Sequence, residues 1–327
     1  ARSTLRQAVF PYTALFRSIE GPLDAQREAG ILQRWREILA RPPAPALQAL
    51  VRPPPGPKIS RRAGFSLEAQ LADGLRRLAR DCGTTPYVVL LAAFRLLLAR
   101  LTGQPDLVIG TPMTLRDRPE LRRLIGCLVN PLALRVPLAL RASFRSQLLR
   151  ERAMVLEVLE YRELPFSRVV AAVSPERKLD EHPLFQVLFS WETETPAEPE
   201  PAETRFSLLS LPAERASYFD LECLLRDAGE GQPLCGYFAW STAVLEDWVA
   251  RQLAPVYSVL LTAIVADPGA PMAELGLLSA AGQQQILHDW NDTAAPYPDG
   301  ADLPDAFLDQ ARRNPDAPAL QADAGSL

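Results

Sequence analysis

The chain has 327 residues, more than a single hydrophobic core usually holds, so two lobes or one lobe with appendages are expected. Its 48% hydrophobic residues, 23% charged residues and net charge of −4 are typical of an ordinary soluble globular protein. Lys and Arg are dispersed among Asp and Glu, which excludes the basic face that nucleic-acid binding needs. The four cysteines form no C-x-x-C pair, and we expect reduced, buried thiols in a cytoplasmic protein.

The first 18 residues, ARSTLRQAVFPYTALFRS, resemble translated adapter ends found in assembled environmental sequences, so residues 1–18 are treated as a candidate foreign leader. Apolar residues at helical spacing predict a helix between Ile19 and Leu50 that ends at Pro42-Pro43, and a proline-rich connector follows. Ser66 is expected to cap the next helix, with Gly83 as its left-handed stop.

Thr85-Pro86 is expected to open a helix that is apolar nearly all round. Its most hydrophobic run, Tyr87–Leu101, contains Arg95 and is shorter than the roughly 20 residues that a membrane helix requires. A core helix is therefore predicted, and no membrane partner.

The short apolar run in DLVIGTP predicts a strand buried on both faces, which together with the preceding helix indicates an α/β fold. Helices are predicted at Ser143–Tyr161, capped by Ser143, at Phe166–Val173 and at Leu245–Ala266. Alternating apolar and polar residues predict the strands FQVLFSW and RFSLLSL and a hairpin of FDLECLLRD and PLCGYFAWS around the turn AGEGQ. The expected fold is a two-layer sandwich of helices on a mixed sheet of about five strands.

Catalytic motifs are absent from the sequence: it has no G-x-S-x-G, H-E-x-x-H, P-loop or G-x-G-x-x-G string. Only His182 and His288 could supply an imidazole, and both are interpreted as structural; no histidine-based metal site is expected. The amide of Asn130 interrupts the apolar run LIGCLVNPLALRVPL. It either turns the chain at the end of a buried strand or holds backbone and ligand groups in a working cavity.

Several stretches together resemble the second half of a condensation domain of a nonribosomal peptide synthetase, over about residues 60–320. The run from Thr85 to Val136 is similar to the family's helix, its following strand, the GTP-x-x-x-R-x-R-x-E loop and the IG-x-F-VNT motif, although Leu128 and Pro131 depart from the latter. YRELPFSRVV resembles the PF-containing motif, and LDEHPLFQVLFSW resembles R-D-x-S-R-N-P-L with its arginines unmatched.

The resemblance implies a chloramphenicol-acetyltransferase-like lobe with residues that line or support a tunnel between two lobes, namely Gly110, Arg116, Gly126, Asn130, Arg135, Pro165 and Phe166. It implies no metal and no directly bound cofactor. The hairpin Asp220–Ser241 is expected to be an arm that reaches across to the other lobe. By resemblance, the intact protein joins thioesters tethered by the phosphopantetheine arms of carrier domains.

The implied domain order is an inter-lobe helix and connector at 19–60, the C-terminal lobe at 61–278, a condensation–adenylation linker at 279–298 and the start of an adenylation domain at 299–327. The family's catalytic H-H-x-x-x-D-G string is absent, so we expect a fragment whose partner lobe is missing and which is inactive alone. Three alternatives remain: an epimerising relative, an acyltransferase that uses coenzyme A, and a non-catalytic scaffold that docks carrier proteins.

Overall fold

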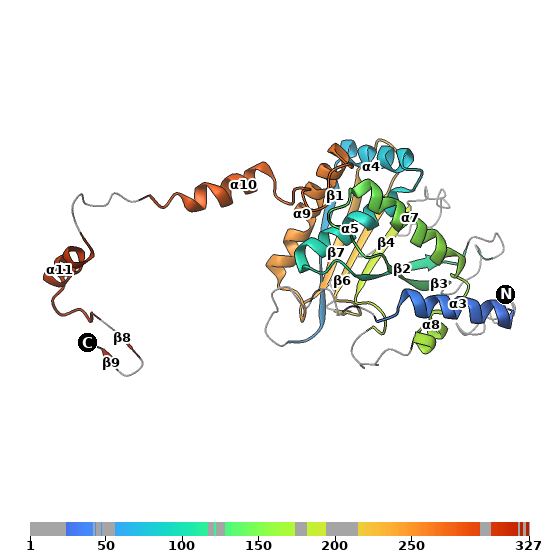
Figure 1. The fold of residues 1–327 in the computed structure, drawn as a ribbon, viewed down its shortest axis with the longest axis horizontal. Coiled ribbons are helices and arrows are strands. Elements are labelled where there is room, and N and C mark those ends of the chain that lie inside the picture. Colours follow the sequence, from blue (N-terminus) through green and yellow to red (C-terminus); the bar gives the residue numbers. More distant parts are fainter. Residues whose placement is uncertain are drawn as a thin grey trace, which may run out of the picture. The chain divides into compact units, whose positions relative to one another are not determined.

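The structure is a computed structural model that describes residues 24–41, 43, 47, 56–116, 121, 128–173, 182–193, 215–294, 302–319, 321–322 and 325–326. The chain divides into two units, 1–279 and 280–327, and each is described by itself (Figure 1). The candidate leader at 1–18 and the predicted strand RFSLLSL lie outside the described residues.

The first unit is built on a seven-stranded mixed sheet with the order β3-β2-β4-β6-β7-β1-β5. The strands are β1 (Ile59–Leu67), β2 (Val108–Thr114), β3 (Val129–Arg135), β4 (Val187–Thr193), β5 (Arg215–Ala216), β6 (Leu221–Asp227) and β7 (Leu234–Ser241). β4 pairs in parallel with β2 and β6, and the other described pairs are antiparallel. The predicted α/β class with a mixed sheet is confirmed, but the expected number of about five strands is wrong.

Helices cover the sheet and join its strands. They are α3 (Ala25–Ile38), α4 (Ala69–Asp81), α5 (Pro86–Thr102), α7 (Phe144–Glu160), α8 (Phe166–Val173) and α9 (Asp247–Ala266). α4, α5, α7 and α9 form one layer in which α5 contacts the other three, while α3 packs on α8 beside β3 (Figure 1). This arrangement makes α5 the centre of the helical layer.

The sequence correctly predicted the helix ends that Gly83, Thr85 and Ser143 mark. The Thr85 side chain accepts a hydrogen bond from the backbone N–H of Val88, Pro86 opens α5, and Ser143 accepts from the N–H of Ser146. Gly83 adopts the predicted left-handed conformation with φ of 61°.

The prediction that Ser66 caps α4 is wrong. Ser66 lies in β1, where it is paired with Cys235 of β7, so its backbone belongs to the ladder and cannot turn into the helix. The N-cap of α4 is Glu68, which makes no capping side-chain bond.

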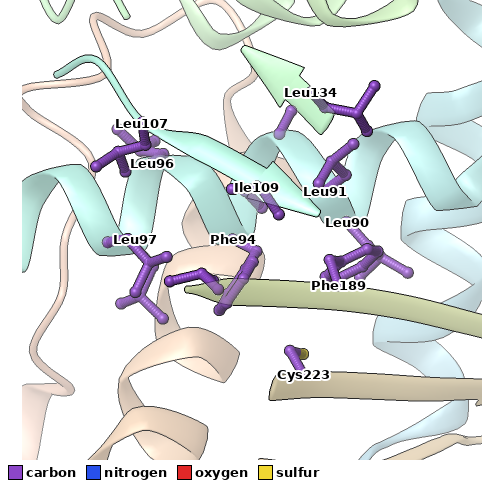
Figure 2. Packing of buried hydrophobic residues seen from close by; sticks show 14 of the residues in the cluster. Leu90, Leu91, Phe94, Leu96, Leu97, Leu107, Ile109, Leu134, Phe189 and Cys223 are labelled. Atoms are coloured by element: carbon purple, nitrogen blue, oxygen red, sulfur yellow. The ribbon is translucent and has the colours of Figure 1, made fainter. Parts of the chain in front are cut away.

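The core forms where α5 meets the sheet. Figure 2 shows Phe94 of α5 among Ile109 of β2, Phe189 of β4 and Cys223 of β6, all of them fully buried. Because α5 is buried on nearly every side, its all-round apolar sequence is the one that this position requires.

One ion pair lies inside this core. The guanidinium of Arg95 on α5 and the carboxylate of Glu151 on α7 are both completely buried, and Arg95 Nη2 lies 3.0 Å from Glu151 Oε1. Arg95 also donates to the carbonyl oxygens of Leu107, at 2.6 Å, and Leu134, at 3.2 Å. The pair therefore ties two helices to the backbone before β2 and in β3, which offsets part of the cost of burying the charges.

α9 is long and apolar enough, by length and composition, to cross a membrane. Its buried residues, which include Leu253, Tyr257 and Leu261, pack against α4, α5 and β7, and the Tyr257 hydroxyl donates to the carbonyl oxygen of Leu90 on α5. A core helix of a globular domain passes the same test, so α9 gives no reason to place this unit in a membrane.

The β6–β7 hairpin was predicted correctly as a hairpin, and its turn contains Gly229 and Gly231 at positive φ. Its predicted role as an arm that reaches across to another lobe stays a prediction. β6 pairs with β4 and β7 pairs with β1, so both strands lie inside the sheet. Arg76 of α4 holds the turn by donating to the Asp227 carboxylate and to the carbonyl oxygen of Gln232.

The second unit contains α10 (Ala280–Leu287), a short 3-10 helix η2 (Asp289–Asn291), α11 (Leu303–Arg313) and the strand pair β8 (Gln321–Ala322) and β9 (Gly325–Ser326). Neither α10 nor α11 contains a buried residue. The proposed linker and adenylation boundaries in this part of the chain stay predictions.

The thiols differ in their surroundings. Cys82, Cys223 and Cys235 are free, and Cys127 lies outside the described residues. Cys223 is buried in the core, where desolvation raises the pKa of its thiol. Cys235 is exposed, so the expectation that all four cysteines are buried is wrong.

Candidate functional site

The Asn130 side chain links β3 to the segment before α8 through three hydrogen bonds, which we call the Asn130 staple. Its Nδ2 donates to the carbonyl oxygens of Arg162 and Leu164, both at 2.8 Å, and its Oδ1 accepts from the backbone N–H of Phe166 at 3.0 Å. The side chain is only 1% exposed. The amide thus satisfies the backbone of the turn between α7 and α8. Asn130 is paired with Met113 inside the ladder, so it does not turn its own chain at a strand end. It holds backbone, as the second explanation has it, and the ligand part of that explanation stays a prediction.

Phe166 connects this staple to an aromatic cluster formed by Phe166, His182, Phe185 and Phe219. The Phe166 ring stacks on His182 with 5.3 Å between ring centroids, and the His182 centroid lies 4.0 Å from that of Phe185. Phe219, which precedes β6, stacks on Phe185 at 5.8 Å. The PF-containing motif and the HPLF segment therefore meet in one place.

Because Gly110 of β2 has no side chain, the Phe185 ring can pack directly against the sheet at this position. A Cβ built on Gly110 would lie 2.0 Å from Phe185 Cε2, closer than any non-bonded contact allows. The glycine is required here by close approach of an aromatic ring, not by an unusual backbone conformation. Gly110, from the GTP motif, and Phe166, from the PF-containing motif, thus both lie against the Phe185 ring.

Arg135, at the end of β3, anchors the C-terminus of α3. It forms an ion pair with Asp106, with Nη2 to Oδ2 at 2.6 Å, and donates from Nη1 to the carbonyl oxygens of Ile38 and Ala40 at 3.1 and 2.7 Å. The bond to Asp106 raises the pKa of the guanidinium. These bonds satisfy carbonyl groups that a helix end leaves without intrahelical partners.

Arg116, just after β2, lies apart from this network and donates from Nη1 to the carbonyl oxygen of Leu121 at 2.8 Å. Pro165 lies within the segment that Asn130 holds, between Leu164 and Phe166. Its carbonyl oxygen accepts from the N–H of Arg168 at 2.8 Å. Gly126 lies outside the described residues.

Neither histidine is placed as a general base. Burial among the aromatic rings lowers the pKa of His182 to about 4, and its Nδ1 is buried without a hydrogen-bond partner among the described residues. His288 is exposed in the second unit. Within the described residues, no three His, Cys, Asp or Glu side chains come together in an arrangement that could hold a metal ion.

Sequence reasoning missed the partners that give these residues their places. Phe185 was quoted only as part of a motif, and nothing in the sequence pairs it with Gly110. Glu151 was not singled out at all. The signal that could have found it is Arg95: a cation within an apolar helix requires a buried anion, and Glu151 lies among the apolar positions of α7.

Comparison with known proteins adds the family. The model of the Condensation domain matches residues 30–287. Malpibaldin synthetase of Mortierella alpina is 32% identical over 310 residues, 93% of this chain and 5% of that protein. Phosphinothricin tripeptide synthetase PhsB of Streptomyces viridochromogenes is 35% identical over 312 residues, 92% of this chain and 26% of that protein. The chain thus spans a small part of the length of these relatives.

Solved structures share the fold. A four-domain nonribosomal peptide synthetase bound to AMP and glycine matches with a TM-score of 0.76 at 22% identity, over 94% of this chain and 24% of that chain. The X-domain from teicoplanin biosynthesis matches with a TM-score of 0.70 at 22% identity, over 81% of this chain and 60% of that one. With the family match over most of its length, the chain belongs to the condensation-domain family of nonribosomal peptide synthetases.

Proposed function

We propose that this chain forms the C-terminal lobe of a condensation domain, one wall of a tunnel in which an amide bond is made. Two thioesters would enter on the phosphopantetheine arms of carrier domains. The amine of one attacks the thioester carbonyl of the other, the C–S bond breaks, and the released thiol takes up a proton. The family match over residues 30–287 is the observation that carries this proposal.

The part of this chain in the reaction is positioning. Asn130 fixes the turn that leads into Phe166, and Gly110 fixes the Phe185 ring against the same cluster. Arg135 fixes the end of α3, which we propose to be the crossover between the lobes. We propose that Arg116, Gly126 and Pro165 support the tunnel wall from their loops. Holding two tethered reactants in place replaces a bimolecular encounter, which can lower the barrier by several kcal/mol.

The imidazole that assists the amine would come from a partner lobe. The sequence has no H-H-x-x-x-D-G string, and a histidine whose pKa is about 4 is a poor proton acceptor near neutral pH. We therefore propose that the chain alone does not condense substrates. Its proposed partners are that N-terminal lobe, carrier domains and a downstream adenylation domain joined through residues 279–298, all in the cytoplasm.

The test is an amide-forming assay with both carrier domains loaded, followed by mass spectrometry of the product on the acceptor arm. The chain alone is expected to give no product, and the same chain joined to a condensation N-terminal lobe that carries the histidine motif is expected to give it. Turnover by the chain alone would contradict the claim of inactivity, and no turnover by any joined form would contradict the proposed reaction.

A non-catalytic docking scaffold is the second candidate, and the lack of a suitable imidazole in this sequence favours it. A scaffold would bind loaded carrier domains without product even in the complete parent protein. Binding measured beside the assay above separates the two functions.

A further inference from the structure

Glu222 is a carboxylate on the face of the sheet that points away from the helical layer. Figure 2 shows Ile109, Phe189 and Cys223 directed towards α5. Because side chains alternate along a strand, Glu222, which precedes Cys223 in β6, points to the opposite face. β6 lies between β4 and β7, so the carboxylate rises from the interior of the sheet and not from its edge.

The strand register places Glu222 in a row with the family-matched glycine. Glu222 is paired with Leu188 of β4, and Leu188 is paired with Gly110 of β2. Two strand spacings, about 10 Å, thus separate Glu222 from Gly110 on the same face. On its other side Glu222 is paired with Ala239, which is paired with Arg62 of β1.

The ladder partners of Glu222, Leu188 and Ala239, are apolar, as is Leu224 two residues along the same strand. Tyr237, paired with Leu224, is also near: burial and then the Glu222 carboxylate raise the pKa of its hydroxyl. Burial raises the pKa of the Glu222 carboxyl group itself. Among the residues that the structure describes, none forms a hydrogen bond or an ion pair with the Glu222 carboxylate. A partly buried carboxylate without a partner costs free energy, and such groups gather where a ligand supplies the missing partner.

The cationic side chains on the same face are engaged elsewhere. The Arg62 guanidinium lies over the Tyr237 ring, 5.9 Å from its centroid. Arg226 donates from Nε to Glu192 Oε2 at 2.7 Å. Among the described residues, therefore, no cation pairs with Glu222, whereas Glu192, a carboxylate on the same face one strand away, pairs with Arg226.

From this arrangement we infer that Glu222 binds a primary ammonium group presented to this face of the sheet. The ligand class is the α-ammonium of an aminoacyl group, the form that the attacking amine of the proposed reaction has before it loses its proton. This inference rests on the proposed function for that identity. Beside apolar side chains a charge-assisted hydrogen bond between ammonium and carboxylate is stronger than in water, so Glu222 would orient the amine.

The probe pair is glycinamide, whose amine is protonated near neutral pH, and N-acetylglycinamide, which is neutral. Binding to the complete 327-residue chain is followed by NMR, with the side-chain carboxyl carbons of the glutamates labelled. Glycinamide is expected to lower the pKa of Glu222, and N-acetylglycinamide to leave it unchanged. This readout uses the unsubstituted protein, so it holds whether or not a variant folds.

Two variants complete the test. E222Q is expected to bind glycinamide about 10-fold more weakly or worse, the effect of losing a hydrogen bond to a charged group, and E192Q is expected to bind like the unsubstituted chain. Equal binding by E222Q, equal response to both probes, or loss of binding in E192Q alone would overturn the inference.

The two proposals fail separately. A chain that binds glycinamide through Glu222 but never supports amide formation with a partner lobe refutes the proposed function alone. A joined protein that forms product with E222Q at an unchanged KM for the acceptor refutes the role of Glu222 alone.

Discussion

The Asn130→Ala substitution removes three hydrogen bonds of one buried side chain at once. It leaves the carbonyl oxygens of Arg162 and Leu164 and the N–H of Phe166 without their partner at a site that is 1% exposed. With a net contribution of about 0.5–1.5 kcal/mol for each bond, the free energy of unfolding should fall by about 2–4 kcal/mol. Asn130→Asp should cost at least as much at neutral pH, because a carboxylate oxygen would then face two carbonyl oxygens.

Urea unfolding followed by circular dichroism measures this loss, and a fall of each kcal/mol should also lower the Tm by about 2–4 °C for a unit of this size. Gln33→Ala is the matched control, because the exposed Gln33 amide donates only to Glu37 at 3.4 Å. It should change the free energy of unfolding by less than about 0.5 kcal/mol. A loss below about 1 kcal/mol in Asn130→Ala, or a milder effect of aspartate than of alanine, would refute the staple.

Gly110→Ala should destabilise the unit by about 1–3 kcal/mol, measured by the same unfolding curves, because the new Cβ would lie 2.0 Å from the Phe185 ring. Arg95→Met should cost about 3–5 kcal/mol, because it leaves the buried Glu151 carboxylate without its cation, and the double variant with Glu151→Leu should recover much of that loss. His182→Asn should flatten the acid limb of the stability profile: the imidazole pKa is lowered to about 4 in the fold against about 6.5 unfolded, so the unfolded state binds more protons and stability falls as pH drops from 6.5 towards 4.

The predictions for Gly110 and His182 each have a matched control variant, and the double variant serves as the control for Arg95. Gly64→Ala places a Cβ 3.7 Å from the nearest atom, an ordinary contact, and should be tolerated far better than the change at Gly110. His288→Asn changes an exposed imidazole and should leave the acid limb in place. Tolerance of Ala at Gly110, additive losses in the Arg95 and Glu151 double variant, or an unchanged acid limb in His182→Asn would each contradict the corresponding reasoning.

The sequence by itself determined the features that depend on neighbours a few residues away. Thr85-Pro86 fixes the start of α5, Ser143 fixes the start of α7, and Gly229 and Gly231 supply the positive φ that the β6–β7 turn requires. Such signals act through one turn of chain, so they can be interpreted without knowing the fold. The all-round apolar pattern of α5 likewise indicated a helix covered on several sides, and this helix followed by the apolar run at β2 indicated the α/β class.

The tertiary structure decided everything that depends on a partner far along the chain. β1 is a strand because its backbone pairs with β7. Ala63, Phe65 and Leu67 alternate with Gly64 and Ser66, but this signal is short, and Ser66 was interpreted as a helix cap instead. Asn130 finds its carbonyl partners 32 and 34 residues later, and Arg95 finds Glu151 56 residues later. The apolar ladder partners of Glu222 follow only from the register of β6 with its two neighbours. Hydrogen bonds and ion pairs are short-range in space but not in sequence, so their partners are fixed only when the chain has folded.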